Sequence, residues 1–237
     1  MPTLYNNPVV LTAQAHGDLK RATVRTFEFA RTLNCVPVTL EEITKLVPHY
    51  PVVFLNGKVP TLVAALGVRN DENLFIDDKG NWAPGCYIPA YVRRYPFVLA
   101  KISDDKVVLA AELDPKQFDA DGTALFEGNR PSKLSRDVFH FCSEFQKGLE
   151  ETLAFCEEVR DAGLLQAKVC TIKLKIGDPL RLTGFTAVDE KILDELDNRT
   201  VNGWRKKHCL KYLYHHIASL ERMGDLAVRA GKQPAEV

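Results

Sequence analysis

Aromatic and arginine side chains are concentrated in one stretch of the chain, residues 73–97. This stretch contains one of the two tryptophans, three of the seven tyrosines and an adjacent arginine pair. These residues are Trp82, Tyr87, Tyr91, Tyr95, Arg93 and Arg94. Both types of side chain offer a large contact area and a defined hydrogen-bonding edge. We therefore expect this stretch to form a polar recognition surface.

The arginine pair has two alternative roles. On a helix, Arg93 and Arg94 point about 100° apart, so they do not easily hold one anion together. Tyr91 shares a helix face with Arg94 and with Tyr95. One arginine could stack on an aromatic ring and hold a carboxylate of the protein itself, while the other meets an anion of a ligand or a partner. The alternative is an internal tie between this helix and a loop such as 70–78.

His16 is the one histidine that lies in a polar, irregular segment, Ala15–Asp18. Such a position predicts a solvent-facing side chain that is able to take part in acid–base chemistry or ligand contact. We include it with the recognition surface. The expected ligand- or partner-binding residues are His16, Asn73, Trp82, Tyr87, Tyr91, Arg93 and Arg94.

Three histidines near the C-terminus do not have the spacing of a metal site. His208 and His215 are seven residues apart. One ion would then need a further ligand on the intermediate helical turn, where Tyr212 is a poor one. His216 falls on an apolar seam, which favours a hydrogen-bonded core histidine. Ser219 follows it by three residues, and we expect its hydroxyl to bond back to a helix carbonyl.

No recognised catalytic or nucleotide-binding motif occurs in the sequence. A GxSxG elbow, a Walker loop, a GxGxxG turn and an HExxH helix are all missing. The six cysteines form no CxxC pair, and we expect them to be reduced thiols, several of them acting as small hydrophobic residues. We expect no catalytic residue, no metal and no cofactor. A Cys–His pair brought together only by folding stays open as an alternative.

Composition and charge limit the classes of partner. Lysine plus arginine and aspartate plus glutamate number 31 each, so the formal net charge is zero, whereas a general nucleic-acid-binding protein needs a basic excess. No apolar run approaches the roughly 20 residues of a membrane-spanning helix. The N-terminal segment lacks the pattern of a signal peptide. These features predict a cytoplasmic protein that neither inserts into a membrane nor binds nucleic acid.

The N-terminal part of the chain, residues 1–113, is expected to be rich in antiparallel strands, with a short helix at 41–47. Three hairpins are expected, at 51–68, 73–82 and 97–113, around turns at Asn56–Gly57, Asp78–Gly80 and Ser103–Asp105. Residues 114–132 are polar and turn-rich, and we interpret them as a connector.

The C-terminal part, residues 133–237, changes to a helical period. Apolar residues recur from Leu134 to Val159 at helical spacing over about seven turns. After this long helix, the pattern predicts a hairpin around Gly177–Asp178, a short helix near 190–197 and a second long helix at about 201–230. We therefore predict an α+β protein in which a strand-rich, antiparallel N-terminal part packs as one body with a helix–hairpin–helix C-terminal part.

Several segments of the chain resemble the bacterial SapC family. These segments are YPVVF, PTLVAALGV, ENLFIDDKGNW, YIPAYVRRYPFVLA, GFTAVDEKILDELD and LYHHIASLERM. The resemblance runs from about His16 to Arg222, and its most specific part is Tyr87–Phe97. Positions that match the family's pattern are His16, Tyr50, Pro51, Gly67, Asn73, Leu74, Phe75, Trp82, Tyr87, Pro89, Tyr91, Arg93, Arg94, Tyr95, Pro96, Gly184, Asp189, His216 and Ser219. His215 departs from it, because the family usually has a small residue there.

The resemblance implies a context and no activity. The family takes its name from an association with surface-layer genes. Its members resemble proteins encoded near outer-membrane receptors, flavin-dependent halogenase-like enzymes and cupin-like proteins in Gram-negative bacteria. The implied role is linked to the uptake or modification of a peptide or small molecule.

We expect a non-catalytic binding or accessory protein that recognises a peptide, a small molecule or a protein of a receptor or modifying-enzyme system. A homo-oligomer is compatible with this role. One alternative is an enzyme acting on a peptide or amino-acid-like substrate. It requires a deep pocket that joins His16 to residues 87–94 and contains a perturbed histidine. The other alternative is a structural protein of the surface layer.

Overall fold

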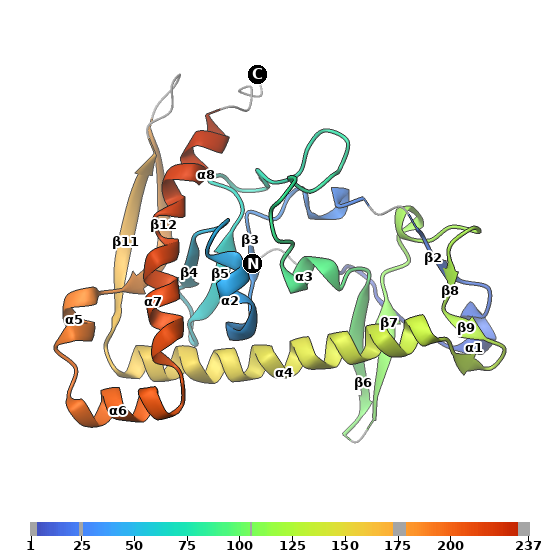
Figure 1. Ribbon diagram of the computed structural model, residues 1–237. Helices are drawn as coiled ribbons and strands as arrows, with labels where there is room; N and C mark the ends of the chain where they lie inside the picture. Colours follow the sequence, from blue (N-terminus) through green and yellow to red (C-terminus); the bar gives the residue numbers. More distant parts are fainter. Residues whose placement is uncertain (1–3, 24–25, 105, 173–178, 232–237) are drawn as a thin grey trace.

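The main element of the fold is a five-stranded antiparallel sheet built from both ends of the chain. The computed structural model describes residues 4–23, 26–104, 106–172 and 179–231. The strand order is β11-β12-β4-β5-β3. The bounds are β3 (Cys35–Pro37), β4 (Val52–Leu55), β5 (Thr61–Ala65), β11 (Leu165–Ile172) and β12 (Leu180–Val188). Because β12 pairs with β4, the C-terminal hairpin completes a sheet that the N-terminal strands begin (Figure 1).

The expected hairpins are present, although one is much reduced. Strands β4 and β5 pair around the predicted Asn56–Gly57 turn. The hairpin expected at 73–82 consists of a single bridge between Ile76 and Trp82. The Asp77 carboxylate closes that turn by accepting two backbone N–H groups, at 2.8 and 2.9 Å. Strands β11 and β12 pair as predicted, and the turn expected at Gly177–Asp178 lies outside the described residues.

A second, three-stranded antiparallel sheet has the order β1-β7-β6. Its strands are β1 (Val9–Val10), β6 (Phe97–Ser103) and β7 (Lys106–Ala111), which confirms the hairpin expected at 97–113. Residues 114–132 contribute short pieces of structure: β8 pairs with β2 near the N-terminus, and β9 pairs with β10, both antiparallel. These strands are β2 (Lys20–Arg21), β8 (Thr123–Ala124), β9 (Phe126–Glu127) and β10 (Arg130–Pro131).

Six short helical pieces connect the strands of the first half. They are α1 (Ala13–His16), η1 (Glu28–Ala30), η2 (Leu40–Glu42), α2 (Ile43–Leu46), α3 (Ala90–Arg93) and η3 (Pro115–Gln117). Segments η2 and α2 form the helix predicted at 41–47. They begin at a capping box in which the side chains of Thr39 and Glu42 each bind the other residue's backbone N–H.

Helix α4 (Lys133–Asp161) is continuous over 29 residues, as its apolar stripe predicted. The Ser132 hydroxyl caps its start by accepting the N–H of Ser135 at 3.3 Å. Gly163 follows its end with φ of 73°, a conformation that glycine adopts without a steric penalty. The helix contacts β5 and η2 and also β6 and β7, so it runs past both sheets (Figure 1).

The α+β class is confirmed, and the helix expected at 201–230 is divided. The short helix expected near 190–197 is α5 (Glu190–Asp194). The long helix is replaced by α6 (Asn198–Lys206), α7 (Leu210–Ser219) and α8 (Arg222–Ala230). His208 has φ of 57°, which a right-handed helix does not allow. Helix α6 therefore ends before His208, and the chain continues in another direction as α7. Helices α7 and α8 follow one another as one long, bent helical arm (Figure 1).

His216 and Ser219 attach α7 to the five-stranded sheet. The His216 Nδ1 atom lies 2.7 Å from the Val52 carbonyl oxygen, and Nε2 accepts the N–H of Val188 at 3.0 Å. Because a carbonyl only accepts and an N–H only donates, the proton must reside on Nδ1. The Ser219 hydroxyl accepts the N–H of Val52 at 3.0 Å and donates to the His216 carbonyl at 2.6 Å. Both residues therefore have the core roles that their spacing predicted.

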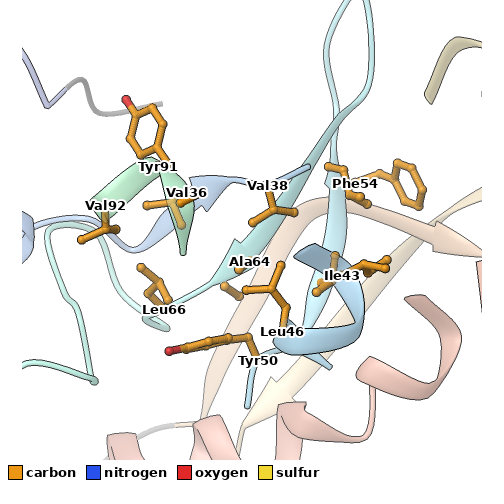
Figure 2. Close-up of a cluster of buried hydrophobic side chains, with 14 of the residues drawn as sticks. Val36, Val38, Ile43, Leu46, Tyr50, Phe54, Ala64, Leu66, Tyr91 and Val92 are labelled. Atoms are coloured by element: carbon orange, nitrogen blue, oxygen red, sulfur yellow. The ribbon is translucent and has the colours of Figure 1, made fainter. Parts of the chain in front are cut away.

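The largest core joins the five-stranded sheet to the short helices α2 and α3, and residues of α4, α6, α7 and α8 also belong to it. Figure 2 shows Leu46 of α2 close to Ala64 of β5, and Val92 of α3 on the side of Val36 and Leu66. All five of these residues are buried. Within the part of the chain that the structure describes, no helix is both long enough and apolar enough to span a membrane.

Candidate functional site

Helix α3 positions both arginines of the pair. It is four residues long, begins after Pro89 and is soon followed by Pro96, and neither proline continues a helix. Tyr91 and Val92 point into the protein and are buried. Arg93 is exposed in the last turn and Arg94 is half-buried directly after it.

Glu42 is a buried carboxylate that fixes the start of α3. Its Oε2 atom accepts the N–H of Ala90 at 2.9 Å and the Tyr87 hydroxyl at 3.1 Å, and its Oε1 atom accepts the N–H of Thr39 at 3.1 Å. Burial raises the pKa of Glu42 above its ordinary value, and these donors and the nearby Arg93 partly offset the shift. The carboxylate therefore holds α3, Tyr87 and η2 in one arrangement.

The Arg94 guanidinium is enclosed by three aromatic rings. Its Cζ atom lies 4.6 Å from the ring centroid of Tyr91, 4.9 Å from that of Phe145 and 5.3 Å from that of Tyr5. The Tyr91 contact confirms that these two residues share a face. The Nε atom is buried and meets no hydrogen-bond acceptor among the described residues. The rings therefore hold the cation by cation–π attraction without neutralising its charge.

Arg93 is held by a different set of contacts. Its Nε atom donates to the Ile88 carbonyl at 3.0 Å, and its Nη2 atom donates to the Tyr87 hydroxyl at 2.8 Å. Its Cζ atom lies 5.0 Å from the centroid of the Phe141 ring. The internal tie considered for this arginine is thus made to residues 87–88. No hydrogen bond from it to the loop 70–78 is found among the described residues.

A cavity of about 220 Å³ lies between α3, the start of β6 and the first half of α4. Its charged lining is Arg21, Arg93, Arg94 and Asp137, and its apolar wall is formed by Phe97 together with Leu134, Val138 and Phe141 of α4. The two adjacent arginines both border this cavity. We call this space the arginine cavity.

Positive charge dominates the arginine cavity. Asp137 is exposed and forms an ion pair with Lys133 at 2.5 Å. Neither Arg93 nor Arg94 forms an ion pair with a carboxylate of the described residues. Arginine matches carboxylate and phosphate groups through paired N–H donors. The cavity is therefore suited to an anionic group.

Arg21 is a member of this cavity that the sequence did not indicate. It is 5% exposed, and its Nη1 atom donates to the Gln117 backbone carbonyl and to the Gln117 side-chain oxygen, both at 2.7 Å. Its Nη2 atom donates to the Tyr95 carbonyl at 3.2 Å. The segment around Arg21 lacks a clear period, so only the folded chain brings this guanidinium to α3.

Asn73 and Trp82 lie in the interior. The Asn73 amide donates to the Ala30 carbonyl at 2.9 Å and accepts the N–H of Phe75 at 3.0 Å. The Trp82 indole donates to the Tyr50 hydroxyl at 2.9 Å. Both residues are buried, so they stabilise the segment that precedes α3 from within the core.

Replacement of Trp82 by phenylalanine is expected to lower the free energy of unfolding by about 1–2 kcal/mol, because one buried hydrogen bond and part of the ring packing are lost. Urea denaturation measures this change. The binding of a ligand in the arginine cavity should be unaffected. Weaker binding at unchanged stability would instead place Trp82 at the recognition surface.

His16 lies apart from the arginine cavity. It ends helix α1, on the far side of the three-stranded sheet from α3 (Figure 1). Its Nδ1 atom accepts the N–H of Thr12 at 3.2 Å, a local bond within the same turn. His16 does not line the arginine cavity, so the pocket that the enzyme alternative requires is not formed by these residues.

A larger cavity of about 400 Å³ lies beside β7 and the start of α4. Its walls are mainly apolar, with Val107, Leu109 and Phe139 among them, and Arg136 is its one charged lining residue among those described. Convergent charged groups, which orient a ligand, are found in the arginine cavity instead. We therefore take the arginine cavity as the candidate site.

The fold and the cavity together define an α+β protein with an arginine-lined site. The model of one protein family, SapC, matches residues 11–226, and the chain belongs to the SapC family. Comparison with curated proteins and with solved structures gives no significant match.

Proposed function

We propose that this protein is a non-catalytic binding or accessory protein that holds an anionic group of a peptide or small molecule in the arginine cavity. The observation that carries the proposal is the pair Arg93 and Arg94 on one cavity, without an ion pair to any carboxylate of the described residues. Guanidinium groups that form no direct ion pair with a carboxylate of the described residues favour the binding of an anion from solution.

The rigid setting of the guanidinium groups supports binding. Arg94 is fixed by three rings, and Arg93 is fixed by the Ile88 carbonyl and the Tyr87 hydroxyl. Since these side chains are already ordered, an incoming ligand does not bear the full entropic cost of ordering them. The context that the family resemblance implies points to a ligand that is taken up or modified, and we place this role in the cytoplasm.

The test is native mass spectrometry of the protein purified from its own host at low salt. We expect an anionic small molecule or peptide to copurify with the wild-type protein. The variants Arg93→Gln and Arg94→Gln should each retain at least tenfold less of it, because each loses charge-assisted hydrogen bonds that are worth about 1.5–3 kcal/mol. Arg199→Gln removes an exposed arginine on α6 and serves as the matched control.

Two results would contradict the proposal. The first is equal retention of the ligand by the wild-type protein and both variants, with only the melting temperature lowered, which would make the arginines purely structural. The second is the release of a product from an added substrate in proportion to protein concentration, which would show catalysis.

A further inference from the structure

A second, smaller cavity adjoins the arginine cavity. It has a volume of about 90 Å³. Arg21, Arg93 and Tyr95 line both cavities, so the two cavities lie side by side. The lining of the second cavity therefore indicates the chemistry of the ligand group next to the anionic group.

The walls of the smaller cavity are mainly apolar. Phe27, Phe29, Ile88 and Val92 contribute to it, and Phe29 stacks on Tyr95 with ring centroids 3.9 Å apart. Two of its polar lining residues, Thr26 and Gln117, are bonded to each other, since the Gln117 amide donates to the Thr26 carbonyl at 3.2 Å. The small cavity thus favours a hydrocarbon group.

The volume of the smaller cavity limits the size of that group. An engineered apolar cavity of about 150 Å³ is known to hold benzene, whereas this cavity measures about 90 Å³. A branched aliphatic group of three or four carbons fits this space better than an aromatic ring.

The charges around the arginine cavity disfavour a free amino acid. The ammonium group of a free amino acid is separated from its carboxylate by one carbon atom, so it would lie close to the guanidinium groups and be repelled. Asp137 is the one carboxylate of the described lining residues, and Lys133 already pairs with it. An amide in place of the ammonium removes the repulsion.

We propose that the ligand carries a carboxylate one carbon away from a short, branched aliphatic side chain and from an amide nitrogen, as in an N-acylated leucine or valine or a peptide that ends in one of them. The carboxylate lies in the arginine cavity and the side chain lies in the smaller cavity. This inference rests on the proposed function and names the chemical class of its ligand.

The test is calorimetric titration of the full-length protein with N-acetyl-L-leucine. Compared with this probe, N-acetylglycine is expected to bind at least tenfold more weakly, because it leaves the smaller cavity empty. N-acetyl-L-leucinamide and free L-leucine should each bind at least 30-fold more weakly, because the first lacks the negative charge and the second adds an ammonium group. A tripeptide ending in leucine, with an acetylated N-terminus, separates a peptide from a single N-acyl amino acid as the natural source.

The variant Ile88→Ala tests the aliphatic contact alone. Its backbone carbonyl still accepts the Arg93 bond. The affinity for N-acetyl-L-leucine should therefore fall about tenfold, while the affinity for N-acetylglycine stays unchanged.

Three outcomes would overturn the inference. If N-acetylglycine or acetate binds as tightly as N-acetyl-L-leucine, the aliphatic site is wrong and the arginine cavity stands as an anion site. If inorganic phosphate binds tightly and no carboxylate does, the ligand class is wrong and the anion site again stands. If no anion binds and no adduct copurifies with the protein, both this inference and the proposed function fail.

Discussion

Replacement of Glu42 by alanine is expected to lower the free energy of unfolding by about 3–4 kcal/mol. The variant leaves the backbone N–H groups of Thr39 and Ala90 without their acceptor. An unsatisfied buried donor costs about 1–3 kcal/mol. The Tyr87 hydroxyl loses its acceptor as well, but water reaches this half-buried residue, so its contribution is smaller. Urea denaturation at neutral pH measures the total.

Two further variants distinguish the effect of the Glu42 carboxylate from the general effect of a substitution in this segment. Glu41→Ala removes an exposed carboxylate from the neighbouring position and should change stability by no more than about 0.5 kcal/mol. Glu42→Gln keeps one acceptor oxygen and should lie between the wild type and Glu42→Ala. Equal stability of the two alanine variants would refute the role given to Glu42.

The Glu42→Ala variant should also weaken ligand binding. Tyr87 links Glu42 to Arg93 through consecutive hydrogen bonds of 3.1 and 2.8 Å. When the first bond is lost, the second no longer has a fixed partner, and Arg93 gains freedom that a ligand must remove. The expected loss of affinity is about tenfold, measured with the same probe and at a temperature where the variant is folded.

Acidification is expected to destabilise the protein through His216. Burial lowers the pKa of His216 to about 4, and its hydrogen bond with Val52 only partly offsets this shift. The unfolded chain has an ordinary histidine pKa of about 6.5, so it binds more protons than the folded chain between these two values. Stability therefore falls as pH decreases from about 6.5 to about 4, by up to about 3 kcal/mol from this residue.

The physical reason is the direction of the hydrogen bonds. Protonation places a second N–H on Nε2, which faces the N–H of Val188 at 3.0 Å. Two donors then oppose each other inside the protein, where water is excluded. The charged ring would also have to remain in a site that is 1% exposed.

Denaturation at pH 7.0 and pH 5.0 for the wild type and His216→Gln isolates this effect from the other titrating groups. The glutamine variant should be less stable at pH 7.0 by about 2 kcal/mol, because its amide replaces the two bonds only in part. It should lose less stability than the wild type between the two pH values. A parallel decrease in both proteins would show that His216 does not titrate in this range.

Local patterns in the sequence were sufficient to predict the elements in which a periodic apolar pattern extends over many residues or a distinctive turn sequence occurs. The apolar stripe predicted α4, and Asn56–Gly57 predicted the β4–β5 turn. The division between α6 and α7 was not predicted, because nothing in the local sequence indicates the positive φ of His208.

The candidate site was predicted only in part, since it depends on contacts between distant residues. The aromatic and arginine-rich stretch contains Arg93 and Arg94, which line the arginine cavity. Arg21 reaches Tyr95 across 74 positions of the chain, and no local period indicates such a contact. Tryptophan also has two common uses, in the core and at binding surfaces, and its type alone does not distinguish them.

The pairing of β12 with β4 has a consequence for synthesis on the ribosome. Thr186 pairs with Phe54, and these residues are 132 positions apart. At roughly 5–20 residues per second, the edge of β4 waits for about 7–26 s before its partner is made. An apolar strand edge that stays open for this time is open to pairing with other chains. We therefore expect the nascent N-terminal half to be more open to such pairing than the complete fold.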